Sequence, residues 1–295
     1  MKTQNQAAGD ERAEILCTLK SGWAKYRRQL TRSQRRLSVD ALHDLRVQTR
    51  RLLACLEVFS PVAGGLAKSA TVRTALDKRL SALGPLRDAQ VHLEEFDQAR
   101  KAHPEIQPLH QGLRRRERRL LKAVMAKLKR TGTRKLGHRI GRFSRRLAAG
   151  LAEAHAPQKL RDAFARTVEA ALGGLTAVCR ADFQDHRAVH STRILLKQLR
   201  YGADCLPPTM RSIPPAELKR VRAAISWMGR IHDLDVQLAR FDKQVAKGHL
   251  ALADARAYRG GLTRRRARLI RDCLVFLRRR RTRVKPSAPP SLLPE

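Results

Sequence analysis

The stretch HDLRVQTRR at residues 43–51 returns in altered form as HSTRILLKQLRY at residues 190–201. Both stretches read His-x-x-Arg-x-x-x followed by Arg or Lys, and their histidines, His43 and His190, lie 147 positions apart. On a helix, residues three and seven positions after a histidine share its stripe. Each stretch therefore predicts a helix that points a histidine and at least two cations in one direction, where an anion would meet convergent positive charge.

Two further blocks repeat in the same order. LGPLRDAQV at residues 83–91 matches MGRIHDLDV at residues 228–236, with an offset of 145 positions. RRRER at residues 114–118 matches RRRAR at residues 264–268, with an offset of 150 positions. Three blocks at a nearly constant offset indicate a tandem duplication of a roughly four-helix unit.

The chain is predicted to be all-α, because apolar residues recur at spacings of three and four throughout. Our domain interpretation is a disordered N-terminus (1–10), a first helical-bundle repeat (11–155), a second (156–283) and a disordered basic and Pro/Ser-rich tail (284–295). Together the repeats would form one domain of two pseudo-symmetric four-helix bundles.

Capping residues, prolines and glycines predict where the helices begin and end. Ser38 or Asp40 is expected to cap the His43 helix, and the Ser60-Pro61 pair ends it, because the residue before proline avoids the helical region. The Gly84-Pro85 pair is expected to interrupt the following helix. In the second half, two prolines end the His190 helix, and Pro215 lies in the first turn of the next one.

The charge balance is extreme, with 63 Lys and Arg against 26 Asp and Glu and a net charge of +37. Such a chain attracts nucleic acid, an anionic membrane or another polyphosphate-like polymer. Aromatic residues make up only 4% of the chain, which disfavours recognition of single-stranded nucleic acid by base stacking. A polymer that is recognised only through its phosphates needs no such platforms.

The five cysteines are scattered, without any CxxC spacing. Reduced, buried thiols of a cytoplasmic protein are the expectation, and neither a disulfide scaffold nor a zinc site is expected. No signal peptide, membrane span or membrane partner is predicted, because apolar runs of the required length are absent.

These blocks resemble the CHAD family, which is named for histidines in an α-helical domain. The resemblance rests on four stretches in order, at residues 43–52, 83–91, 190–201 and 229–236, and it covers roughly residues 11–283. One departure is Gln90, where the family pattern has an aspartate. The resemblance implies two four-helix bundles and, between them, a basic groove or pore that binds inorganic polyphosphate. It also implies a stand-alone protein localised at polyphosphate granules in the cytoplasm.

The candidate polyphosphate-binding residues are the cations and neighbouring donors of the repeated blocks. They are His43, Arg46, Arg50, Arg51, Arg87, Arg114, Arg115, Arg118, His190, Arg193, Lys197, Arg200, Tyr201, His232, Arg264, Arg265 and Arg268. Guanidinium groups match phosphate oxygens with a planar fork of donors. A histidine beside a polyanion gains a proton, so affinity is expected to rise as pH falls. The alternatives are a solvated basic face for the arginines and a packing role for Tyr201.

Two patterns suggest metal chemistry but lack support from the repeat. His232-Asp233 resembles the metal-binding doublet of phosphohydrolases, yet Arg87 replaces the histidine in the first half. The i, i+4 pair His186 and His190 has no counterpart and no third ligand. Asp88 and Asp233 are expected to orient neighbouring arginines or to cap a helix turn, and they are excluded from the binding residues. We therefore expect neither metal nor cofactor.

The leading hypothesis is a binding protein, not an enzyme, because no P-loop, nucleophile elbow or paired carboxylates are present. The alternative is a protein that binds nucleic acid without sequence preference. A less favoured alternative is an accessory of a polyphosphate-metabolising enzyme. No feature of the sequence defines an oligomeric state.

Overall fold

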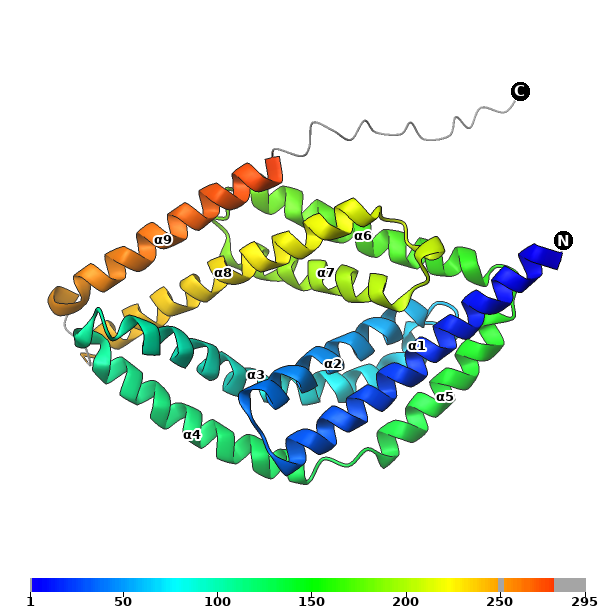
Figure 1. Ribbon diagram of the computed structural model, residues 1–295, viewed down its shortest axis with the longest axis horizontal. Helices are drawn as coiled ribbons and strands as arrows, with labels where there is room; N and C mark the ends of the chain where they lie inside the picture. The colour runs from blue at the N-terminus through cyan, green and yellow to red at the C-terminus, as the bar shows by residue number, and fades with distance from the viewer. Residues whose placement is uncertain (1, 249–251, 279–295) are drawn as a thin grey trace.

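The computed structural model describes residues 2–248 and 252–278, and within these ranges the chain is built from helices (Figure 1). The helices of the first half are α1 (Lys2–Arg35), α2 (Val39–Phe59), α3 (Leu66–Ala99), the short η1 (Pro104–Ile106), α4 (Gln107–Lys129) and α5 (Arg134–Leu151). The second half contains α6 (Ala156–Arg180), α7 (His186–Cys205), the short η2 (Pro208–Met210), α8 (Pro215–Ala246) and α9 (Leu252–Arg278).

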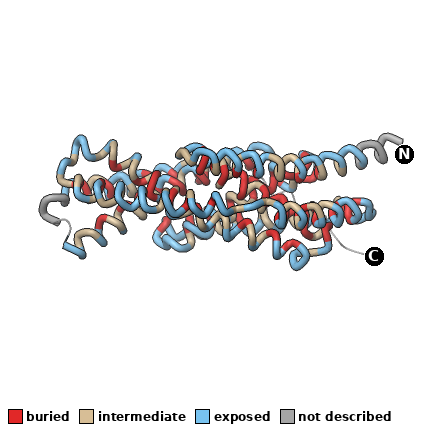
Figure 2. The backbone as a smooth tube through the Cα atoms, turned by 90° about the horizontal axis from the view of Figure 1, so that it is seen from below, coloured by how far each residue is buried: buried red, intermediate tan, exposed pale blue. Residues whose placement is uncertain are grey.

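Helices that follow one another in sequence pack side by side. In the first half α1 contacts α2, α2 contacts α3 and α3 contacts α4, and the second half repeats this order from α6 to α9. The two halves meet mainly where α2 packs against α7. Buried residues lie on the inward sides of the helices, as the rotated view shows (Figure 2). They form one continuous apolar core. The all-α prediction is thus confirmed for the described residues.

The two histidine-bearing helices begin with equivalent caps. The Ser38 hydroxyl accepts a hydrogen bond from the Ala41 amide of α2 (3.1 Å). The Asp185 carboxylate accepts hydrogen bonds from the Arg187 (2.8 Å) and Ala188 (3.1 Å) amides of α7. These side chains satisfy donors that a helix N-terminus leaves unpaired. The expected cap at Ser38 is confirmed, and α2 ends before Ser60 as predicted.

Two predicted features differ in the structure. α3 continues through Pro85, so the expected interruption at Gly84-Pro85 is absent. A proline removes one intrahelical hydrogen bond, and packing on both sides holds the helix together across it. α1 begins at Lys2, so residues 2–10, which we expected to be disordered, continue the helix. The expected tail at 284–295 lies outside the described residues.

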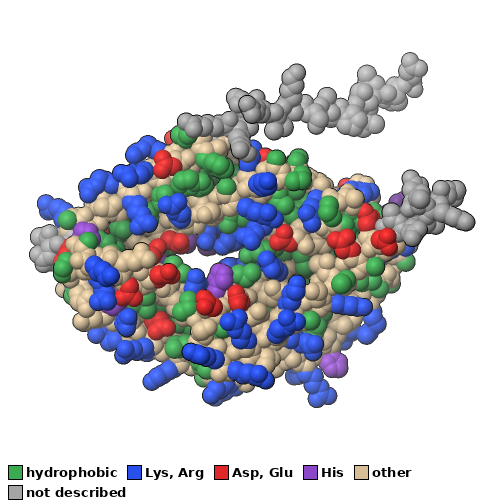
Figure 3. Space-filling view, in the orientation of Figure 1, with side chains coloured by type: hydrophobic (Ala, Val, Ile, Leu, Met, Phe, Trp, Pro, Cys, Tyr) green, Lys and Arg blue, Asp and Glu red, His purple; other side chains and the backbone are tan. Residues whose placement is uncertain are grey.

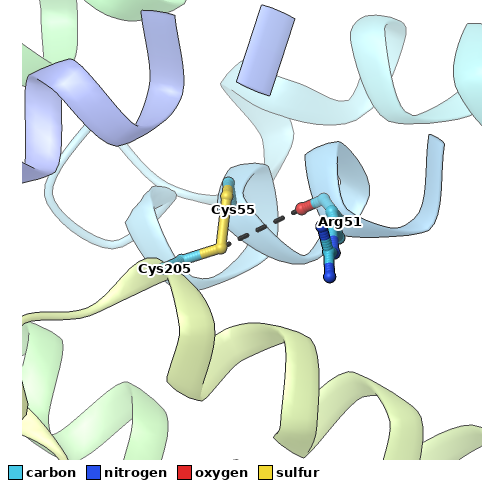
Figure 4. The surroundings of a disulfide bond; sticks show 3 residues. All are labelled: Arg51, Cys55 and Cys205. Carbon is cyan, nitrogen blue, oxygen red and sulfur yellow. Dashed lines mark hydrogen bonds between the residues drawn. A yellow bond between two sulfur atoms is a disulfide. The ribbon is translucent and has the colours of Figure 1, made fainter. Parts of the chain in front are cut away.

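A disulfide joins Cys55 of α2 to Cys205 at the end of α7, with the two Cα atoms 5.6 Å apart (Figure 4). Both cysteines are buried. The prediction that all cysteines are reduced thiols is therefore wrong for this pair. The bond closes a loop of 150 positions and ties the first half of the chain to the second.

A second close contact accompanies this bond. A Cβ atom on Gly202 of α7 would lie 3.1 Å from the Val58 side chain of α2, so glycine lets the two helices approach closely. At the offset of 147 positions between α2 and α7, Gly202 is the equivalent of Cys55, and Cys205 is the equivalent of Val58. The Gly202–Val58 contact is therefore the repeat-related equivalent of the Cys55–Cys205 disulfide, with the two helices exchanged.

Candidate anion-binding site

The seam between the halves contains a cavity of about 290 Å³ bordered by α2, α3 and α7. Its cationic and histidine lining consists of Arg50, Arg73, His190, Arg193 and Lys197. Tyr201, Gln198 and the acids Glu57 and Asp77 complete its polar lining. In the space-filling view, an opening between the two halves is bordered by basic, histidine and acidic side chains (Figure 3). The packing of α2 on α7 thus brings cations from both histidine-bearing stretches together.

Arg46 and Arg193, the arginines three positions after each histidine, occupy equivalent niches. Arg46 donates a hydrogen bond to the Leu80 carbonyl of α3, in the turn before Pro85 (3.2 Å). A Cβ atom on Gly84 would lie 3.6 Å from Arg46 Nη1, and one on Gly229 would lie 3.3 Å from Arg193 Nη2. The glycine of each Leu/Met-Gly block therefore lies against the guanidinium group of the neighbouring helix, and only at Gly229 would a Cβ atom crowd it.

Burial and mutual repulsion perturb the cations of this seam. Burial, followed by repulsion from Arg193, Arg50 and Arg46, lowers the pKa of Lys197 to about 7. Burial and repulsion from Arg50 and Arg87 lower the pKa of Arg46 to about 10. These shifts report cations held close together and away from water. An anion in the cavity would offset the repulsion among Arg50, Arg193 and Lys197, which line it.

The carboxylates of the repeated Arg/His-Asp pairs oppose this repulsion. Burial is the main cause that lowers the pKa of Arg46 and of Arg193. Asp88 acts in the opposite direction on Arg46, and Asp233 does so on Arg193. Burial raises the pKa of Asp233 itself. The two carboxylates thus influence equivalent arginines of the two halves, and their role in orienting arginines stays a prediction.

The histidines lie at the margins of the cation cluster. The ring centroids of His190 and His232 are 5.2 Å apart. Burial lowers the pKa of His232, and Arg193 and His190 add repulsion. Burial and repulsion from Arg87 lower the pKa of His43. His43 and Arg87 line a separate hollow of about 780 Å³ against α4, together with Arg114 and Arg118.

Other predicted binding residues do not line the cavity between α2, α3 and α7. The carbonyl oxygen of Arg51 lies 3.9 Å from Cys205 Sγ, beside the disulfide (Figure 4). The Arg200 guanidinium lies over the Tyr201 ring, 5.2 Å from its centroid. Arg115 borders a third hollow on α4. Three arginines of α9 are exposed, namely Arg264, Arg265 and Arg268. The binding roles of all these residues stay predictions.

Sequence reasoning missed three charged cavity residues, two of them on α3, and one structural arginine. Arg73 and Asp77 line the cavity from α3. The short connection between α2 and α3 was the available signal, because it places the start of α3 beside the end of α2. Arg266 of α9 pairs with Asp235 and donates to the Phe183 carbonyl (3.3 Å), thereby holding the turn between α6 and α7. Its position among the buried apolar residues of α9 was the missed signal.

The described residues contain no cluster of three or more His, Cys, Asp or Glu side chains that could hold a metal ion. His186 contacts Asp235 (3.0 Å), so this histidine has a carboxylate partner. No helix within the described ranges is long and apolar enough to cross a membrane.

An all-helical protein with a cation-lined cavity between its two halves is the class that this fold and site define. The family model of the CHAD domain matches residues 19–212, so the chain belongs to the CHAD domain family. The crystal structure of the CHAD domain from the plant Ricinus communis has a similar fold, with a TM-score of 0.63 and 19% sequence identity. The match covers 90% of this chain and 91% of that chain. No curated protein sequence matches the chain.

Proposed function

We propose that this protein binds inorganic polyphosphate in a basic groove between two pseudo-symmetric helical bundles, residues 11–155 and 156–283. The family is linked to polyphosphate binding. The observation that carries the proposal is the convergence of equivalent cations, from two repeated helices, on one cavity. The reciprocal contacts of α2 with α7 support the pseudo-twofold relation, because a twofold interface pairs residues in this crosswise way.

Electrostatics favour a repetitive anion over a compact substrate. Arg50 and Lys197 come from different halves, and each repels Arg193. A polymer with about one charge per unit can place successive phosphates against successive guanidinium forks. The two repeated stripes would then hold one chain of phosphates between them.

We propose a binding role without catalysis. Phosphoryl transfer normally combines cations with metal ions that carboxylates hold. Asp88 and Asp233 instead oppose the lowering of the pKa of Arg46 and Arg193 by burial, which supports this part of the proposal. Magnesium- or manganese-dependent release of phosphate that disappears in Asp233→Ala would overturn this part of the proposal.

Localisation at polyphosphate granules follows from the proposed ligand and shares its test. The cytoplasmic part of the hypothesis drew partly on reduced cysteines, and the disulfide between Cys55 and Cys205 removes that part of its support. Disulfides persist mainly in oxidising compartments. Microscopy of the tagged protein against a polyphosphate stain tests the localisation directly.

Competition between polymers tests the proposed function against general charge attraction. Labelled polyphosphate is bound first, and duplex DNA is then added at equal phosphate concentration. We expect polyphosphate to stay bound, because a duplex is too wide for a cavity of about 290 Å³. Displacement by DNA would refute a groove selective for polyphosphate. Salt dependence alone does not separate the two polymers, since counterion release governs both.

The pH dependence of binding should report Lys197. Its pKa of about 7 in the free protein rises when a polyanion binds, because the protonated amine is favoured. Affinity should therefore fall by up to about tenfold per pH unit above pH 7 and level off below it, apart from histidine protonation at lower pH. Lys197→Arg should flatten the dependence above pH 7. Titration calorimetry in buffers of different ionisation enthalpy measures the proton uptake, and equal uptake in both proteins would contradict this assignment.

The glycine niches provide a graded test of arginine position. Gly229→Ala should push Arg193 aside and weaken polyphosphate binding by about fivefold, a cost of about 1 kcal/mol. Gly84→Ala is the matched control, because its Cβ would make only an ordinary contact with Arg46. Its affinity should stay within about twofold of the parent. Equal effects of both substitutions in a direct binding assay would contradict the proposed niche.

A further inference from the structure

α5 presents a strongly basic face that the repeat does not explain. The repeated blocks lie on α2 and α7, on α3 and α8, and on α4 and α9, whereas α5 carries none of them. α5 contains no Asp or Glu and six Lys and Arg residues. These are Arg134, Lys135, Arg139, Arg142, Arg145 and Arg146.

The two faces of α5 are sharply divided. Leu136, Ile140, Phe143 and Leu147 are buried, and the helix packs against α1 and α3. At 100° per residue, the six cations occupy roughly 140° of the opposite side. They extend over roughly 18 Å of helix, at 1.5 Å per residue. Figure 1 shows α5 at the outer edge of the molecule, away from the seam between α2 and α7.

These cations are not neutralised within the described part of the chain. None of the ion pairs between described residues involves a cation of α5. Arg139 donates only a long hydrogen bond to the Thr71 carbonyl (3.5 Å). The nearby Trp23 side chain packs against Gly137, with Arg27 over its ring, and so extends the surface onto α1. The face keeps its charge for an external partner.

We infer that the outer face of α5 binds the phosphate backbone of double-stranded DNA, at a site separate from the polyphosphate cavity. The convex helix has the diameter of about 10–12 Å that fits a major groove about 12 Å wide. Its cations are spread widely enough to reach phosphates on both sides of the groove. A-form RNA is a poorer partner, because its major groove is too narrow for such a helix.

This binding is independent of base sequence. The exposed residues of α5 are Arg and Lys with His138, Ala148 and Ala149, and α5 contains no Asn or Gln that would read adenine edges. Phosphate contacts position a protein on DNA without specifying sequence. The chain can therefore hold polyphosphate and DNA at the same time.

Two charge-matched triple variants test this inference. Arg142, Arg145 and Arg146 are replaced by Gln on α5, and Lys219, Lys243 and Arg271 are replaced by Gln on α8 and α9. All six residues are exposed, so both variants should fold, and both lose three charges. Affinity for a short DNA duplex is measured over a series of salt concentrations.

The α5 variant should bind DNA about 100-fold more weakly at low salt, and its log–log salt slope should be smaller by roughly 3. The α8–α9 variant should change the slope little, and a cavity variant, Arg50→Gln with Lys197→Gln, should keep DNA binding. Equal losses in the two triple variants would reduce the effect to net charge and overturn the inference.

Displacement of DNA by polyphosphate from the parent protein would show that polyphosphate takes the α5 face, and it would also overturn the inference. Failure of the cavity proposal looks different. In that case the cavity variant would keep polyphosphate binding, whatever happens on α5.

Discussion

Reversing the charge of Arg46 together with Arg193 abolishes polyphosphate binding, if the seam between α2 and α7 holds the polymer. Arg46 lies on α2 and Arg193 on α7, one in each repeated stretch. Burial removes the water that would screen their charges. Arg193 lines the cavity, whereas Arg46 acts on it through its charge beside Lys197. Loss of the Arg193 contact, at about 1.5–3 kcal/mol, corresponds to at least about tenfold, and two new carboxylates beside the remaining cations add repulsion that removes the rest. Arg46→Glu with Arg193→Glu is measured by fluorescence anisotropy with labelled polyphosphate.

The control variant carries the same change of net charge on the exterior. Lys219→Glu with Arg271→Glu alters exposed residues of α8 and α9, and its affinity should fall only slightly. Because Arg46 and Arg193 are largely buried, a milder pair, Arg50→Gln with Lys197→Gln, guards against misfolding. Equal affinity losses for the seam and exterior variants would show that net charge alone attracts the polymer.

Reducing the disulfide should lower the free energy of unfolding by about 5 kcal/mol. A link across 150 positions restricts the unfolded chain strongly, and the chain-entropy relation gives about this value for such a loop. Urea denaturation with and without reductant measures the difference. The Cys55→Ala/Cys205→Ala double variant is the control, since reductant should leave its unfolding midpoint unchanged.

The thiol content of the same samples checks the bond itself. Unfolded protein that has not met reductant should show two fewer reactive thiols than the five cysteines of the chain. Five reactive thiols, with a midpoint that reductant leaves unchanged, would contradict the disulfide. The result also bears on compartment, because a reducing cytoplasm would open the bond.

Local patterns were sufficient to predict most of the helices. The cap at Ser38 and the end of α2 before Ser60 follow from side-chain chemistry within a few residues. The repeated blocks predicted that Arg46 and Arg193 are equivalent, and both arginines lie against the glycine of their neighbouring helix. The continuation of α3 through Pro85 was missed, because it depends on packing against other helices.

Contacts between distant segments were harder to predict. The disulfide depends on how α2 crosses α7. Cys55 pairs with Cys205, which is the equivalent of Val58, and not with its own equivalent, Gly202. Arg51 and Arg200 carry the same charge as Arg50 and Lys197, yet neither of them lines the cavity. Charge and spacing predict a basic helix face, and the tertiary crossing decides which members of it reach the cavity.

A crystal structure of the protein with bound polyphosphate tests the central claim most directly. We expect a chain of phosphates in the seam between α2 and α7, in contact with Arg50, Arg193 and Lys197. Phosphates found only on the exterior of α4, α5 or α9, with these three side chains uncontacted, would contradict it.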